Sequence, residues 1–252
     1  MTTQAVTNQA AASSTSPLLR YYGGKILENP KFVSLYAGDF WSTRQGATQQ
    51  AKIDRCSSSV PSGPHASVWE EYGVSPGTFK GSARIPLGNP RLAVTERDIR
   101  TMVATAIRQS GVTAPDGETV YTVFLPPKVA LTDGYADSRD GMGGYHGSYR
   151  DEKTGKKVYY AAIAYTDKGN GVQFTSNSVD NITIAASHEW TEAVTDPDVN
   201  AGKLGWYNKR FGEVGDIPIS LGYPLSQLWG RIDGCAVQKE WSNALGEPVL
   251  TE

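Results

Sequence analysis

The segment SHEWTE, residues 187–192, has the residue types and spacing of a metal-binding helix. On an α-helix, His188 and Glu192 lie on one face about one turn apart, so both side chains can reach a single ion. Glu189 is rotated by about 100° from His188, which places its carboxylate where a general base can act on water. The pattern His-Glu-x-x-Glu has glutamate where zinc peptidases carry a second histidine. It predicts a metal-dependent hydrolase, with a solvated polar helix face as the alternative.

A further ligand is expected from the segment that follows this helix. A catalytic zinc site needs three protein ligands and one open position. Glu213, in GEVGD, follows a glycine-containing segment that can fold back, and we expect it to complete the metal set His188, Glu192 and Glu213. Asp216 is expected to contact one of these metal ligands, without binding the metal itself, and so to orient it. Asp196 is an alternative ligand or a similar supporting residue, or else a turn former beside a proline, and the turn is favoured.

The carboxylate ligands affect the expected metal. Two glutamates and one histidine leave the site with one positive charge fewer than two histidines and one glutamate, so the pKa of a bound water is lowered less. Oxygen ligands favour harder ions, whereas imidazole favours a transition metal. We therefore expect one zinc ion per chain, with calcium and manganese as alternatives.

The chain has three histidines, and the other two carry different expectations. His146 stands near glycines in GGYHGSY, where the backbone can approach a substrate and the imidazole can stabilise an oxyanion. The residues alone support this catalytic role and a hydrogen-bonded loop histidine equally. His65 is interpreted as structural or surface. Tyr145, Trp206 and Tyr207 can line a cleft, although packing is the more common role of such aromatics.

Hydrophobic patterns predict the elements that must position these residues. We expect strands at residues 32–36, 119–127 and 157–166, a helix at 95–110 capped by Thr95 and Asp98, and a second helix from Asp180 or Asn181 to about Asp196. Residues 43–90 are expected to be mainly irregular, with one short helix near 67–72, and residues 133–149 to form a glycine-rich loop. This order predicts a single α+β or α/β domain over residues 18–252 after a disordered arm at 1–17.

Composition excludes several function classes. The chain has 252 residues, a net charge of -2 and a pI near 6.0, which gives no electrostatic attraction to nucleic acid. It contains no apolar run of about 20 residues, so no membrane span is expected, and the N-terminus lacks the pattern of a signal peptide. Cys56 and Cys235 can form one disulfide or stay reduced. Nothing in the sequence indicates an oligomeric state.

Several segments together resemble a known family. They are YYGGKILENPKFVSLYAGDFW, YTVFLPPKVALTDGYADSRDGMGGYHGSY, SHEWTEAVTDP, GWYN, GEVGD and CAVQKEWSN. They resemble the EXORDIUM-like, phosphate-induced protein family and its bacterial zinc metallopeptidase-like branch, over roughly residues 21–243 and more weakly over 43–118. The helix and its return segment also resemble thermolysin-like zincins.

The resemblance implies a secreted protein with a zincin-like domain. In such a domain a mixed twisted sheet packs against a capped helix and the metal-binding helix, followed by an irregular C-terminal part. The resemblance also implies a site role for His146, beside His188, Glu189, Glu192 and Glu213. Relatives commonly place a cysteine shortly after the GD of GEVGD, where this chain continues differently.

The leading hypothesis is a zinc-dependent hydrolase that acts on a peptide or another small substrate. Glu189 is the predicted general base, and His146 is a second catalytic candidate. One alternative is a non-catalytic, metal-containing binding or growth-signalling module of the same fold. Another is a metal-dependent enzyme that acts on a non-protein substrate.

Overall fold

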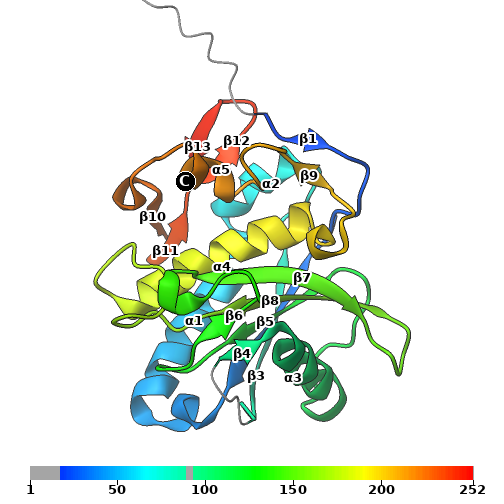
Figure 1. Ribbon diagram of the computed structural model, residues 1–252, viewed down its shortest axis with the longest axis vertical. Helices are drawn as coiled ribbons and strands as arrows, with labels where there is room; N and C mark the ends of the chain where they lie inside the picture. The colour runs from blue at the N-terminus through cyan, green and yellow to red at the C-terminus, as the bar shows by residue number, and fades with distance from the viewer. Residues whose placement is uncertain (1–17, 89–92, 252) are drawn as a thin grey trace, which may run out of the picture.

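A mixed five-stranded sheet forms the centre of the molecule (Figure 1). The computed structural model describes residues 18–88 and 93–251, so the predicted disordered arm at 1–17 lies outside the described residues. In spatial order the strands are β3 (Thr78–Ile85), β2 (Lys31–Ala37), β5 (Thr119–Phe124), β8 (Lys157–Ile163) and β7 (Gly144–Arg150). The first four are parallel, and β7 pairs antiparallel with β8 at one edge. The protein is therefore a mixed α+β structure, as predicted.

Helices cover both faces of this sheet because its central strands are apolar on both sides. Phe32, Tyr36 and Phe124 face a core that they share with α1 (Arg44–Ser62) and α4 (Ser178–Thr195). The intervening side chains, such as Leu35 and Val123, face a second core shared with α3 (Glu96–Gln109). Figure 1 shows α4 and α3 on opposite sides of the sheet.

The two predicted amphipathic helices are confirmed, with one change of cap. Thr95 and Asp98 form a reciprocal capping box at the start of α3. Helix α4 begins earlier than predicted, because Asn177 is its N-cap and accepts hydrogen bonds from two backbone N–H groups. The side chain of Asn181 instead accepts from the loop before the helix. Asp196 ends α4, as expected from the proline that follows.

The prediction of mainly irregular structure at residues 43–90 was wrong. This region contains the 19-residue helix α1, the short α2 (Ser67–Glu70) and strand β3. Helix α1 is polar and serine-rich, and it has a weak pattern because few of its side chains, such as Ile53 and Val60, are buried. Its formation depends on Thr43, which caps it, and on packing against β3 and α4.

The C-terminal part consists of short elements placed over α4 (Figure 1). Outside the five-stranded sheet, the described residues form four two-stranded ladders along the chain. They are β1 (Arg20–Tyr21) with β9 (Trp206–Tyr207), β4 (Val94–Thr95) with β6 (Leu131–Thr132), β10 (Trp229–Ile232) with β11 (Cys235–Gln238), and β12 (Glu240–Ser242) with β13 (Glu247–Val249). Helix α5 (Asp216–Ser220) is short, and the 3₁₀ turns are η1 (Asp39–Ser42), η2 (Pro64–Ala66), η3 (Ser138–Asp140), η4 (Val199–Ala201) and η5 (Leu225–Gln227). None of the helices in the described ranges is both long and apolar enough to cross a bilayer.

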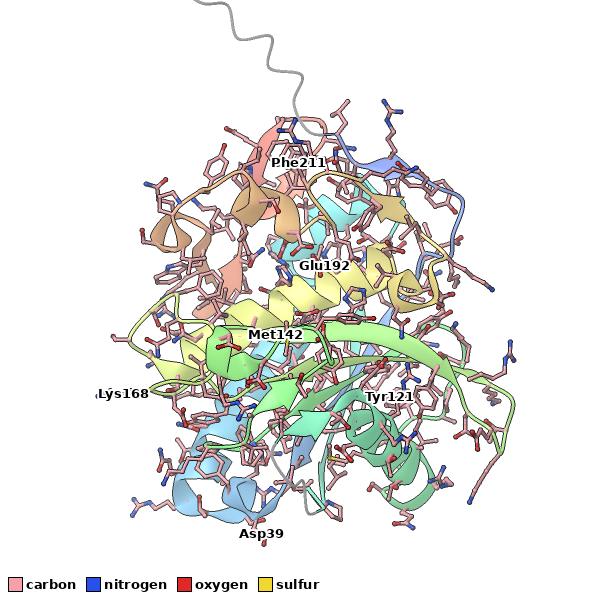
Figure 2. All side chains as sticks on the ribbon, viewed as in Figure 1. Asp39, Tyr121, Met142, Lys168, Glu192 and Phe211 are labelled. Atoms are coloured by element: carbon pink, nitrogen blue, oxygen red, sulfur yellow. A yellow bond between two sulfur atoms is a disulfide. The ribbon has the colours of Figure 1, made fainter. Side chains whose placement is uncertain are left out.

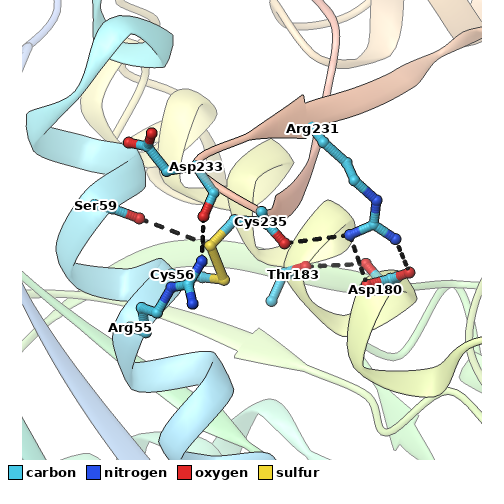
Figure 3. Close-up of a disulfide and its surroundings, with 9 residues drawn as sticks. Arg55, Cys56, Ser59, Asp180, Thr183, Arg231, Asp233 and Cys235 are labelled. Carbon is cyan, nitrogen blue, oxygen red and sulfur yellow. Dashed lines mark hydrogen bonds and ion pairs between the residues drawn. A yellow bond between two sulfur atoms is a disulfide. The ribbon is translucent and has the colours of Figure 1, made fainter.

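One disulfide links this C-terminal part to helix α1 (Figure 3). Cys56 of α1 is bonded to Cys235 of β11, with the two Cα atoms 5.6 Å apart and a sequence separation of 179. Nearby, Arg231 forms an ion pair with Asp180 of α4. The β10–β11 hairpin is thus fixed against both α1 and α4.

Candidate metal centre

The C-terminal half of α4 presents the predicted site residues. The whole segment from Asn181 to Asp198 is buried except His188, which is partly exposed. This burial arises because α4 lies between the sheet and β11, and its side chains Ile182 and Trp190 belong to the sheet-facing core. Figure 2 labels Glu192 in the middle of the molecule, on α4. The polar face of α4 is therefore an interior face, not a solvated one.

The segment after α4 returns to this face as predicted. A tight turn at residues 208–212 leads into Glu213, and α5 then starts at Asp216. Gly215 lies directly against the helix, because a Cβ added there would stand 2.4 Å from His188 Nδ1 and 3.0 Å from Glu192 Oε1. Only glycine allows this close approach. Gly215 therefore allows the segment that carries Glu213 and Asp216 to lie against α4.

His146 comes from β7 and not from a loop, which corrects the sequence interpretation. It is paired with Ala161 of β8, is 7% exposed, and points toward α4. Its Nε2 donates to the backbone oxygen of Asp196 at 3.2 Å, so its Nδ1 has the free lone pair. Nδ1 lies 3.4 Å from Glu189 Oε2 and 3.7 Å from Glu192 Oε2. A metal-binding histidine commonly donates its other nitrogen to a carbonyl in this way.

The structure arranges the ligand candidates in two groups that share Glu192. One group is His146, Glu192 and Glu213, and the other is His188, Glu192 and Asp216. Within each group the ligand atoms all lie within 4.8 Å of one another. The three predicted ligands are therefore divided, because Glu213 is grouped with His146 and Asp216 takes the expected place of Glu213 beside His188.

The spacing within these groups suits a shared ion better than direct hydrogen bonds. His188 Nε2 lies 3.3 Å from Glu192 Oε2 and 3.8 Å from Asp216 Oδ1. His146 Nδ1, the nitrogen that is free to bind an ion, lies 3.7 Å from Glu192 Oε2. Good N–H···O hydrogen bonds are about 2.7–3.2 Å long, whereas two ligands of a tetrahedral zinc with bonds of about 2.0–2.1 Å lie about 3.4 Å apart. The described residues can thus hold a metal ion.

The charges of the cluster depend strongly on one another. Burial lowers the pKa of His188, but the carboxylates of Glu192 and Glu189 outweigh it and raise this pKa well above its usual value. Burial similarly lowers the pKa of His146, and Glu189 and Glu192 raise it overall. Burial raises the pKa of Glu192, but His188 and His146 together lower it more, so this pKa is lowered overall. Glu192 is the carboxylate most strongly held in its ionised form here.

The neighbouring acids experience the opposite effect. Burial and the charge of Glu192 raise the pKa of Glu213 well above its usual value and that of Asp216 to about 7. Burial also raises the pKa of Asp196 to about 6. Asp196 Oδ1 accepts from the backbone N–H of Gly205 at 2.7 Å, so this residue forms the turn and also supports His146 through its backbone oxygen.

Two further polar residues border the site and were not predicted. The amide nitrogen of Gln238, on β11, lies 2.8 Å from Gly215 O and 2.9 Å from His188 Nδ1. In the neutral imidazole Nδ1 therefore accepts, and Nε2 carries the proton that faces Glu192. Metal binding through Nε2 requires the Gln238 amide to turn, so that its oxygen accepts from Nδ1–H. The separation of 50 residues between His188 and Gln238 left no local signal in the sequence.

Glu240, on β12, is the second unpredicted residue. It is completely buried, and neither carboxylate oxygen has a hydrogen-bond partner among the described residues. Burial raises its pKa well above the usual value, although His188 lowers it in part. A protonated Glu240 is therefore expected next to the cluster.

Two neighbouring cavities border the cluster. One, of about 550 Å³, is polar and includes His146, Glu192 and Glu213. The other, of about 350 Å³, is mainly apolar, with the lining residues Met142, Val172, Phe174, Ile219 and Leu225. Both are lined by Gly144, His188, Glu189 and Asp216, so the two cavities adjoin at the candidate site, and the polar one is the cleft that contains the candidate ligands. Glu189 lines both cavities.

The remaining candidates have separate positions. His65 packs against Trp69 and is buried, and burial lowers its pKa to about 4, in line with the structural interpretation. Tyr145 lines the polar cavity. Trp206 packs against Tyr72 and donates to its backbone oxygen, which is a packing role.

Comparison with known proteins gives no match: no protein-family model and no curated sequence matches the chain.

Proposed function

We propose that this protein is a zinc-dependent hydrolase that acts on peptides or other small substrates. One observation carries the proposal: histidines and buried carboxylates from three separate segments, β7, α4 and the return after α4, meet in a cleft. Such a group of acids costs free energy unless a cation compensates it. The resemblance to zinc metallopeptidase-like proteins supports zinc, and the helix with its return segment supports a zincin-like arrangement.

In this proposal His188, Glu192 and Asp216 hold the catalytic zinc. This group is the more open of the two, since the side chain of Asp216 is 45% exposed. A bound zinc supplies Lewis acidity and lowers the pKa of water. Glu189 accepts the proton of the attacking water and passes it to the leaving group. The polar and apolar cavities on the two sides of Glu189 bind the two parts of the substrate.

The proposal extends to localisation. A disulfide between Cys56 and Cys235 is typical of proteins in an oxidising compartment. Together with the family resemblance, this supports a secreted protein.

The first test is metal content, measured by mass spectrometry on protein purified without added metal or chelator. We expect zinc in the parent protein and less zinc in His188→Ala, with both folded by circular dichroism. The exposed variant Glu152→Gln is a matched control that should keep its zinc. A folded parent protein that takes up no metal, even after incubation with zinc, would contradict the proposal and favour a non-catalytic binding module.

A further inference from the structure

We infer that the centre binds two divalent cations, with Glu192 as a ligand to both. The second cation is held by His146, Glu192 and Glu213, beside the first position at His188, Glu192 and Asp216. This inference rests on the proposed function and goes beyond its single zinc ion.

The first argument is geometric. Each group contains its own histidine and its own acid, and the groups have only Glu192 in common. The two histidines approach Glu192 Oε2 from different elements, at 3.3 Å for His188 Nε2 and 3.7 Å for His146 Nδ1. A carboxylate has two oxygens and about four lone-pair directions, which allows it to bridge two ions. Two-metal hydrolytic sites have this construction, with ions about 3.5–4 Å apart.

The second argument is the number of charges. Glu189, Glu192, Glu213 and Asp216 all face the cleft. In the part of the chain that the structure describes, the ion pairs of these four acids are with His146 and His188. When both groups bind metal, the histidines are neutral and Glu213 and Asp216 give up their protons, so the four negative charges balance two divalent cations.

The third argument is the buried oxygen atoms. Glu213 is 7% exposed and Glu192 is 4% exposed. Both have an Oε1 atom that is buried and has no hydrogen-bond partner among the described residues. A buried carboxylate oxygen without a partner is costly. An ion in the second position would satisfy Oε1 of Glu213.

The two positions also differ in character. All three members of the His146 group are buried, and His146 is already oriented by its bond to the Asp196 carbonyl. The His188 group is partly open, and its histidine needs the Gln238 amide to turn before it can bind. We therefore expect the buried position to fill first and the open position to exchange its ion more readily.

The test is the stoichiometry and the magnetic coupling of bound Mn²⁺. Apoprotein is titrated with MnCl₂, bound metal is counted by mass spectrometry after gel filtration, and the sample is examined by electron paramagnetic resonance. We expect about two ions per chain and a coupled-pair spectrum, as for bridged two-metal sites. Titration with ZnCl₂ should give the same ratio.

Variants assign the positions. Glu213→Gln should remove the buried ion and Asp216→Asn the open ion, and each variant should keep one uncoupled Mn²⁺ ion. The control Glu152→Gln should keep the coupled pair. The coupled spectrum of the parent protein tests the inference even if a variant fails to fold.

The outcomes separate this inference from the proposed function. One ion per chain at saturation contradicts the pair and leaves the single-zinc hydrolase in place. Two ions without magnetic coupling contradict the bridging role of Glu192. No bound ion contradicts both.

Discussion

At the scale of single residues, Glu192 organises the site. His188 and His146 lower the pKa of Glu192. The charge of Glu192 in turn raises the pKa values of Glu213 and Asp216. The helical spacing of His188 and Glu192 was readable from the sequence, because both lie on one turn of one helix. The contributions of Gln238 and Glu240 were not, since both reach the cluster from strands far along the chain.

The role of Glu189 is tested by Glu189→Gln. If Glu189 is the general base, the change keeps the shape of the side chain and removes its basicity, so kcat should fall by about 10²- to 10⁴-fold. Metal content should stay at the parent level. The measurement is peptide hydrolysis followed by mass spectrometry, beside metal analysis. Full activity of Glu189→Gln would remove this residue from the mechanism.

The acids of the cluster predict how pH affects the metal-free protein. The pKa values of Asp196 and Asp216 are raised to about 6 and about 7, so the folded state binds more protons than the unfolded state between about pH 4 and 7. Their stabilising contribution is complete below pH 4 and is lost as the pH rises through 6 to 7. The raised pKa values of both histidines act in the same direction at higher pH.

We therefore expect the Tm of chelator-treated protein to fall by several degrees from pH 5 to pH 7.5. Added zinc should restore the Tm at pH 7.5 and have little effect at pH 5, where protons compete for the ligands. Differential scanning fluorimetry at matched ionic strength measures both. A Tm of the chelated protein that rises over this range would contradict the raised pKa values of these two acids.

At the scale of elements, three segments determine the site: α4, the edge strand β7 and the return through Gly215. The sequence predicted α4 and the return, because a helical period and a glycine-containing connection are local signals. It did not predict β7. Glycine-rich strands have a weak pattern, and β7 is fixed by its pairing with β8.

The return segment is tested by Gly215→Ala. The added Cβ would overlap with His188 Nδ1, so the return must move away from α4 and take Asp216 with it. We expect zinc affinity to fall by about 10- to 100-fold, the usual effect of disturbing the groups that orient ligands. Isothermal titration calorimetry gives the affinity.

The matched control is Gly230→Ala, whose Cβ would meet only the flexible side chain of Leu250. It should bind zinc as the parent protein does. Equal affinities in the two variants would contradict the proposed contact between the return segment and α4.

At the scale of the whole molecule, the Cys56–Cys235 bond joins α1 to β11, the strand that packs on α4 (Figure 3). Strand β11 carries both Cys235 and Gln238, so the disulfide holds the support of His188 in place. A bond that closes such a long loop restricts the unfolded chain strongly.

We expect reduction, or the double change of Cys56 and Cys235 to serine, to lower the free energy of unfolding by about 2–5 kcal/mol. Zinc affinity should fall as well, because β11 is less firmly held. Chemical denaturation with and without reductant measures the stability, and the parent protein with the disulfide intact is the reference. An unchanged midpoint would mean that packing alone fixes β11.

The sequence by itself determined the local features: the strands at 31–37, 119–124 and 157–163, the capped helix α3, the end of α4 at Asp196, and the face shared by His188 and Glu192. These depend on side-chain period, caps and turns within a few residues. Only the tertiary structure decided that His146 joins Glu192 and Glu213, that Asp216 joins His188, and that the polar α1 is a helix. Such features depend on strand pairing, on layers packing across the chain and on charges that meet only when distant segments fold together.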